Sequence, residues 1–332
     1  MAGYSRLRGV TMGTGEMRAR MADLSPILVT GARGLMGTAL SRALARLEVP
    51  GILAPSRAEL DLLDADATER YFARHRPATV VHLAAVVFGL GGNLGHQTGI
   101  LAQNTLINNN IFCAIARHPV RKCFYAGTVA SYPFPYKSET LQESEFFNGL
   151  PHSGEFGYGA AKRHAYCYLH LLAKDIGLSF AYGIFTNLYG ENDRFNIDDG
   201  HVIPSLIAKA HAAAQSNGHL QVWGDGSAER DFLHADDAAR AVIACLASDE
   251  KELLLNISSG EGVGMRTLAE CVAAAAGLPG VVYLPAKPTG IPRRVVDNTR
   301  MRRLGVEPAI RLEDGIRAAY RWYSQNAASA RT

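Results

Sequence analysis

The sequence predicts an α/β fold with a doubly wound parallel sheet and a smaller C-terminal α/β lobe. Three observations carry this prediction. Short apolar runs alternate with helical segments as far as Thr186, a glycine-rich turn directly follows the first run, and the alternation breaks down beyond Thr186. Alternating strands and helices are typical of parallel sheets whose crossover helices cover both faces.

The predicted strands are short apolar runs of the kind that lies buried in a parallel sheet. The first is SPILVTG, and all five are expected at 25–31, 51–56, 78–85, 122–128 and 178–185. Amphipathic or apolar helices are expected between and after them, at 35–47, 66–77, 100–117 and 158–177. A glycine-rich loop at 88–96 precedes the third helix.

The second half begins with a polar loop at 191–201. Shorter elements follow it, namely a strand at 221–224 and helices near 203–215, 235–247, 266–276 and 312–325. These pieces predict a second lobe that closes over the edge of the first. We therefore expect a nucleotide-binding domain at 26–186 with parts of 220–260, and a substrate lobe made mainly of 187–325.

Residues 1–25 hold four arginines and no apolar core of a signal peptide, so we expect a disordered extension. The chain has 332 residues, of which 48% are hydrophobic, and a net charge of +3, which is too small to indicate nucleic-acid binding. Five scattered cysteines without metal or redox spacing indicate reduced thiols in a cytoplasmic protein. No run approaches the roughly 18 apolar residues of a membrane helix.

The glycine-rich turn reads TGARGLMG and places Gly31, Gly34 and Gly37 at regular spacing between the first strand and helix. Glycines there permit a tight turn and a close approach to a pyrophosphate, which the helix N-terminus binds. The alternative is a plain strand–helix turn. We expect the Rossmann form of the doubly wound sheet and a dinucleotide site.

The residues after the second strand decide which dinucleotide is expected. An NAD site usually places an acidic residue there to hold the ribose hydroxyls. This sequence has Ser56 and Arg57 instead, and Arg33 lies within the glycine loop. Two guanidinium groups suit a 2′-phosphate, which favours NADP(H). Arg57 could equally be a solvated surface charge.

A Tyr-x-x-x-Lys motif carries the predicted chemistry. Tyr158 and Lys162 are one helical turn apart and share a face. A nearby ammonium is expected to lower the pKa of the phenol, which can then give a proton to a ketone oxygen. Thr128 ends the fourth strand, at the edge where such sheets bind ligands, and is expected to hold the same oxygen.

These motifs resemble the extended short-chain dehydrogenases/reductases of the NAD-dependent epimerase/dehydratase family. TNLYG (186–190), GHVIPSLI (200–207), VWGDGSAERDFLHADD (222–237) and KPTGIPRR (287–294) look like the GDP-L-fucose synthase subgroup, over about residues 26–325. Members of that subgroup are NADPH-dependent 3,5-epimerases and 4-reductases that act on GDP-4-keto-6-deoxy-D-mannose. The resemblance also implies a homodimer, paired through the helix with the apolar residues Tyr166, Leu169 and Leu172.

The resemblance assigns roles to individual residues. The expected catalytic residues are Thr128, Tyr158, Lys162 and His201, the last as an acid/base. The expected cofactor contacts are Gly31, Arg33, Gly34, Leu35, Met36, Gly37, Arg57, Gly127, Tyr158, Lys162, Phe185, Asn187 and Leu188. The expected substrate contacts are Asn187, Lys209, Trp223, Arg230 and Arg294. No metal site is expected, because Asp225, Asp236 and Asp237 read as caps of a turn and a helix.

One departure from the subgroup concerns Ala130, two residues after Thr128. The synthases have a cysteine there that moves protons at C3 and C5 together with the histidine. Neither Ala130 nor Val129 can carry a proton, and the sugar 4,6-dehydratases have Asp and Glu at these positions. The sequence therefore predicts a 4-keto reductase whose epimerase activity is lost or weak, since a proton-transfer group typically contributes 10²–10⁴-fold.

Other functions remain open at this point. A bifunctional synthase is the first alternative, because His201 is retained. Thr289, where the subgroup commonly has Asp, and Lys209, where it has Arg, suggest a different GDP-linked sugar, such as another 6-deoxy sugar or a heptose. An NAD-dependent nucleotide-sugar 4-epimerase and an NADP-binding redox sensor are further alternatives, although such sensors tend to lack the Tyr or the Lys.

Overall fold

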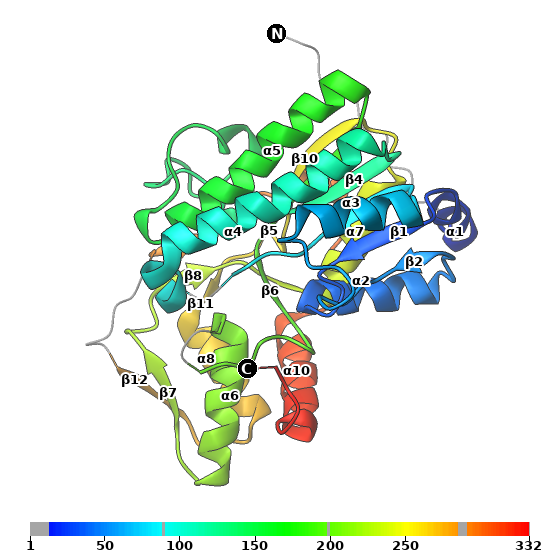
Figure 1. The fold of residues 1–332 in the computed structure, drawn as a ribbon. Helices are drawn as coiled ribbons and strands as arrows, with labels where there is room; N and C mark the ends of the chain where they lie inside the picture. The colour runs from blue at the N-terminus through cyan, green and yellow to red at the C-terminus, as the bar shows by residue number, and fades with distance from the viewer. Residues whose placement is uncertain (1–12, 88–89, 198–199, 285–290, 332) are drawn as a thin grey trace.

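The computed structural model describes residues 13–87, 90–197, 200–284 and 291–331 (Figure 1). Its centre is a six-stranded sheet in the order β10-β5-β4-β3-β1-β2, in which all neighbours pair in parallel. The strands are β1 (Ile27–Thr30), β2 (Ile52–Leu53), β3 (Thr79–His82), β4 (Lys122–Thr128), β5 (Ser179–Phe185) and β10 (Glu252–Ile257). The predicted doubly wound fold is confirmed.

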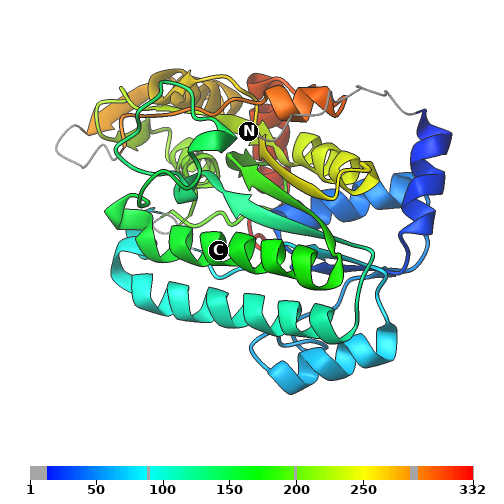
Figure 2. The ribbon, with the colours of Figure 1, turned by 90° about the horizontal axis from the view of Figure 1, so that it is seen from above.

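Helices cover both faces of this sheet (Figure 2). One face packs against α2 (Leu35–Arg46) and α7 (Ala235–Ala247), which form one buried core with it. The other face packs against α4 (Leu90–Arg117) and α5 (Phe156–Ile176), with α3 (Ala65–His75) beside them. Strand side chains alternate between the two cores, because successive residues of a strand point to opposite faces.

The register of the sheet brings the carboxyl ends of its strands together. Thr128, the last residue of β4, pairs with Phe185, the last of β5, and Thr30 at the end of β1 pairs with His82 at the end of β3. The glycine loop follows Thr30 directly. The sequence motifs at 30–37, 128 and 158–162 therefore meet at one edge of the sheet.

The predicted disorder of residues 1–25 is wrong for the part that the structure describes. Thr14–Asp23 form a helix, α1, whose Met21 is completely buried against the core of α2 and α7. Arg20 binds both carboxylate oxygens of Asp249, at 2.9 and 3.0 Å. Long-range apolar contacts and ion pairs order this helix, and neither kind of contact is visible in a local pattern. Residues 1–12 lie outside the described residues.

Two elements of the nucleotide-binding part differ from the prediction. The sixth strand, β10 (ELLLNI), was not predicted and pairs with β5 along its whole length. α4 begins at Leu90, within the predicted glycine-rich loop, and has non-helical backbone angles at His96.

A second lobe is built around its own apolar core. Its helices are α6 (Val202–Gln215), α8 (Met265–Ala275) and α10 (Leu312–Asn326). Its strands β7 (Leu220–Trp223) and β12 (Val281–Leu284) form a parallel pair. The remaining short elements are β6 (Asn187–Tyr189), β8 (Glu229–Arg230), β9 (Phe232–His234), β11 (Val263–Gly264), β13 (Arg293–Arg294) and α9 (Thr299–Arg303).

The α5 residues proposed for dimer pairing do not face solvent. Leu169 is completely buried and Leu172 is 5% exposed, and Tyr166 packs on the same core. These side chains fill the space between α5 and the sheet, so this part of the prediction is wrong, while the homodimer itself stays a prediction. Among the described residues, no helix is long and apolar enough to cross a bilayer.

Candidate active site

A cavity of about 780 Å³ lies at the carboxyl edge of the sheet, where the second lobe approaches it. Most of the predicted site residues line it: Gly31, Gly34, Leu35, Met36, Gly37, Gly127, Thr128, Tyr158, Lys162, Phe185, Asn187, Leu188, His201, Lys209, Trp223, Arg230 and Arg294. These residues come from both halves of the chain, and one continuous space connects them.

The glycine loop has the geometry of an anion site. Gly31 has a φ of 69°, and a β-carbon on it would lie 2.9 Å from the nitrogen of Ala84. A β-carbon on Gly37 would lie 2.3 Å from the oxygen of Gly31, so only glycine fits there. Gly34 is the N-cap residue of α2 and has no side chain that could bind the first-turn amides, so these amides stay open toward the cavity. These residues fit a phosphate or diphosphate group.

Arg33 and Arg57 do not line the cavity. The side chain of Arg57 is 79% exposed and lies 3.7 Å from Asp61. Arg33 is exposed as well. The N–H of Ser56 donates to Glu59 at 2.7 Å and lowers the pKa of that carboxyl group, and the nearby charge of Arg33 lowers it further. Their predicted role toward a 2′-phosphate therefore stays a prediction.

Tyr158 and Lys162 lie on the first two turns of α5 and face the end of β4. Lys162 Nζ donates to the main-chain oxygen of Ala126 at 2.7 Å. The same nitrogen lies 5.5 Å from the centre of the Tyr158 ring and 4.6 Å from that of Tyr125. The hydrogen bond to the carbonyl group of Ala126 thus holds the lysine close to the ring of Tyr158.

The expected effect of this lysine on the tyrosine is wrong for the cofactor-free protein. Burial raises the pKa of Tyr158, and the carboxylate of Glu155 raises it further. Burial also lowers the pKa of Lys162 to about 7. A charge that has left water is costly, so this enclosed site favours the neutral forms of both groups.

Thr128 and Ala130 begin the loop after β4. Thr128 Oγ1 accepts a hydrogen bond from the N–H of Ala130 at 3.2 Å, which leaves its own proton free to be donated. Ala130 lines the cavity and is 7% exposed. Neither Cys113 nor Cys123 lines this cavity. Burial raises the pKa of Cys123 to about 12, so this thiol is inert.

The guanidinium group of Arg294 is held by two other side chains of the protein. Its Nη1 donates to Glu155 at 3.1 Å, its Nη2 pairs with the second oxygen of that carboxylate, and its Nε donates to the hydroxyl of Tyr136 at 2.6 Å. Arg294 is only 6% exposed and pairs with Glu155 in the cavity wall, and its predicted role toward a diphosphate stays a prediction. Burial and the charge of Arg294 lower the pKa of the neighbouring Arg230 to about 10.

The second lobe brings three predicted residues to the other side of the cavity. Lys209 Nζ lies 4.3 Å from the centre of the Trp223 ring, a cation–π distance. His201 precedes α6 and is exposed at the cavity. Asp193 lies near it and is 5% exposed. Burial raises the pKa of this carboxyl group, and the charges of His201 and Arg331 oppose that shift.

Sequence reasoning missed several ionisable residues that line the cavity, among them His152, Glu155, Asp193, Arg194 and Arg331. Glu155 and His152 stand in the loop before α5 without a recognisable motif. Asp193 lies in a polar stretch where acidic residues are ordinary. No signal in the sequence places Arg331, at the opposite end of the chain from the glycine loop, in this cavity.

The acidic residues near β9 have structural partners, as expected. Asp225 accepts hydrogen bonds from the N–H and hydroxyl of Ser227, at 2.9 and 2.6 Å. Asp236 and Asp237 lie in the first turn of α7, where they bind Arg42 and Arg240. Thr289 lies outside the described residues.

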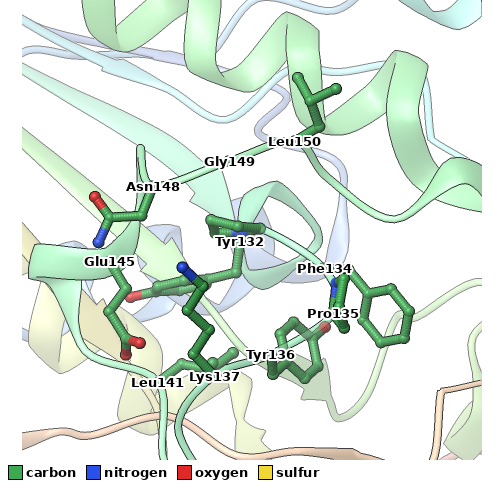
Figure 3. A pocket seen from close by; sticks show the side chains of 11 residues that line it. Tyr132, Phe134, Pro135, Tyr136, Lys137, Leu141, Glu145, Asn148, Gly149 and Leu150 are labelled. Carbon is green, nitrogen blue, oxygen red and sulfur yellow. The ribbon is translucent and has the colours of Figure 1, made fainter.

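A second cavity of about 230 Å³ lies within the loop after β4. Figure 3 shows the aromatic, polar and aliphatic residues around it, namely Tyr132, Phe134, Pro135, Tyr136, Lys137, Leu141, Glu145, Asn148, Gly149 and Leu150. Tyr136 lines this cavity, and its hydroxyl binds Arg294, which lines the large one. The loop is thereby tied to the wall of the large cavity.

Comparison of the sequence with known proteins identifies the family of this chain. A model of the NAD dependent epimerase/dehydratase family matches residues 27–258. The chain belongs to this family. One relative within it is a putative GDP-L-fucose synthase 2 from Oryza sativa subsp. japonica, which is 36% identical over 300 residues, covering 90% of this chain and 86% of that protein. The predicted GDP-L-fucose synthase-like resemblance is confirmed.

Two solved structures of this epimerase/dehydratase fold are also similar. A GDP-L-fucose synthetase from Naegleria fowleri bound to NADP has a TM-score of 0.84 at 27% identity, over 92% of this chain and 96% of that one. A GDP-mannoheptose C4 reductase from Campylobacter jejuni with NADP bound has a TM-score of 0.79 at 26% identity, over 90% and 97% of the two chains.

Proposed function

We propose that this protein is an NADPH-dependent 4-keto reductase of a GDP-linked 4-keto sugar, with its 3,5-epimerase activity lost or weak. The observation that carries the proposal is Ala130, a buried residue that lines the cavity two positions after Thr128. The substrate is a 6-deoxy sugar or a heptose, and the names of the relatives support both classes.

The cofactor is assigned from the glycine loop and from the NADP in similar structures. Gly31, Gly34 and Gly37 would hold its diphosphate at the N-terminus of α2, and Phe185 and Leu188 would line the space nearer the catalytic residues. When bound, NADPH supplies the hydride that reduces the carbonyl carbon.

Three residues of this chain take part in protonating the carbonyl oxygen. Thr128 donates its hydroxyl proton in a hydrogen bond to that oxygen, and this hydroxyl is positioned because its oxygen already accepts from Ala130. Tyr158 donates its proton as negative charge develops on the oxygen, so the ketone becomes an alcohol. Lys162, held by Ala126, supplies the charge that stabilises the resulting phenolate when it is protonated.

Epimerisation requires a base that reaches the carbon atoms next to the ketone. At the cysteine position of the synthases, this chain presents a methyl group. Glu155 is bound to Arg294, and the carboxyl group of Asp193 is only 5% exposed. His152 and His201 also line the cavity and are the remaining candidates for proton transfer at C3 and C5, and they have to act without the cysteine of the synthases.

The test is one reaction in D₂O with the protein, NADPH and GDP-4-keto-6-deoxy-mannose, followed by mass and NMR spectra of the product. We expect NADPH consumption without deuterium at C3 or C5. Deuterium at both carbons together with a fuco product would show that the inference from Ala130 is wrong. Without turnover, the same assay with a GDP-4-keto-heptose distinguishes an altered sugar from an inactive reductase.

A bifunctional GDP-L-fucose synthase is the second candidate. Two observations favour it: His201 lines the cavity, and relatives that are 36% and 33% identical to this chain bear that name. The same experiment separates the two, because a bifunctional enzyme exchanges the protons at C3 and C5 with solvent before the hydride is transferred.

A further inference from the structure

The segment after α10 reaches back to the glycine loop. The N–H groups of Ser329 and Ala330 donate to the oxygen of Asn326, at 2.9 and 2.8 Å, and turn the chain away from the helix axis. The main-chain oxygen of Arg331 then accepts a hydrogen bond from the N–H of Phe195 at 2.7 Å. Figure 1 shows this segment doubling back from the end of α10.

Aromatic packing supports this arrangement. The ring of Phe195 stacks on Trp322 and Tyr323 of α10, with centroid distances of 5.7 and 4.5 Å. The loop at 190–197, which carries Phe195, and the segment at 327–331 are thus anchored to the same helix. The position of Arg331 follows from this packing and from the main-chain hydrogen bond.

The guanidinium group of Arg331 lies in the large cavity, beside the N-terminus of α2. Its Nη1 would be 4.0 Å from a β-carbon on Gly34, the residue that caps α2. The same nitrogen lies 3.5 Å from the main-chain oxygen of Asn192, a long and weak contact. The Arg331 side chain is exposed toward the cavity that it lines.

We propose that Arg331 binds the diphosphate of the dinucleotide cofactor beside the N-terminus of α2, together with the glycine loop. The first-turn amides of α2 hold a diphosphate from one side only, and a planar guanidinium can donate two parallel hydrogen bonds to phosphate oxygens. Arg331 is placed to do this beside Gly34. The proposal rests on the dinucleotide binding proposed above and adds a contact from the far end of the chain.

A competing role for Arg331 is purely structural. The negative charge of Asp193 lies close enough to interact with it, and a second oxygen of that carboxylate has no hydrogen-bond partner among the described residues. If the arginine serves only to balance this carboxylate, its removal changes the stability of the free protein and leaves cofactor affinity intact. The two roles therefore have different measurable consequences.

The experiment compares Arg331→Ala with Arg321→Ala, which removes an equal charge from an exposed position on α10. Dissociation constants for NADPH and NADH are measured separately by the fluorescence of the reduced nicotinamide, and thermal unfolding of the free proteins is recorded. We expect Arg331→Ala to weaken both cofactors by the same factor, roughly 10- to 100-fold, since hydrogen bonds to charged groups contribute that much. Arg321→Ala should change neither constant by more than about twofold.

Other outcomes would overturn the proposal. Weaker binding of NADPH alone would assign Arg331 to the 2′-phosphate, and unchanged binding with a lower unfolding temperature would assign it to Asp193. If the unmodified protein bound neither dinucleotide, the proposed function would fail as well, whereas tight wild-type binding that Arg331→Ala leaves unchanged would contradict this inference alone.

Discussion

Glu155 and Arg294 form a bidentate ion pair within the wall of the large cavity, and the arginine is only 6% exposed. Removing one member of such a pair leaves a buried charge without compensation. We expect Glu155→Ala to lower the free energy of unfolding by about 3–5 kcal/mol. Urea denaturation of the cofactor-free protein measures this.

A neighbouring pair provides the control. Glu229 and Arg293 also form an ion pair, but their side chains are 33% and 39% exposed. Glu229→Ala should cost no more than about 1 kcal/mol, because water screens the partner that is left. Equal losses in the two variants would mean that the Glu155 pair is not buried as described.

The pKa of Lys162 predicts how stability depends on pH. Burial lowers this pKa to about 7, whereas an unfolded lysine titrates near 10.4. Between these values the unfolded state binds a proton that the folded state lacks, so the free energy of unfolding rises with pH. Relative to that of Lys162→Met, the free energy of unfolding of the wild type should rise by up to about 1.4 kcal/mol per pH unit above pH 7.

Urea titrations of the cofactor-free wild type and of Lys162→Met at pH 6, 7.5 and 9 test this expectation. Below pH 7 the difference in free energy of unfolding between the two proteins should be constant, since the lysine is then protonated in both the folded and the unfolded state. A difference that is also constant from pH 7 to pH 9 would mean that the ammonium group is not desolvated in the folded protein.

Tyr158→Phe removes the proposed proton donor and keeps the ring. We expect single-turnover reduction to slow by roughly 10²–10⁴-fold, because a general acid contributes that much, while the dissociation constant for NADPH changes by less than about threefold. Tyr166→Phe is the matched control, since that ring packs on the core beneath α5 and does not line the cavity. An unaffected rate in Tyr158→Phe would mean that another group donates the proton.

Ala130→Cys should create solvent exchange where the wild type has little. A thiol at this position would provide the titratable group that epimerisation needs, so deuterium at C3 and C5 should rise by roughly tenfold or more in D₂O. Ala130→Ser adds a side chain of similar size without an acidic thiol and should not increase exchange. If both variants behave like the wild type, the loss of proton transfer has another cause.

The sequence predicted the parts of this molecule that depend on local patterns. Apolar runs located five strands of the sheet, and the spacing of Gly31, Gly34 and Gly37 located the anion site. Thr128, Tyr158 and Lys162 were expected to meet because parallel strands end at the same edge, and they line one cavity. Each of these predictions required only neighbouring residues and one rule of topology.

The misses depend on contacts between distant segments. The helix that contains Met21 is ordered by a core to which α7, from the second half of the chain, contributes. The bond between Glu155 and Arg294 joins residues that are 139 positions apart, and no local pattern predicts it. The direction of the pKa shift at Tyr158 follows from burial, which motif spacing does not report.

The core of the second lobe is assembled from separate stretches of chain. Residues of α6 and β7, of α8 and of α10 pack together, whereas the intervening β10 belongs to the central sheet and α7 and α9 pack on that sheet. A recombination event cannot exchange this lobe between relatives as one cassette, because a single crossover would divide both cores. Point substitutions on a fixed framework are therefore the simpler route to a new sugar specificity in such a protein.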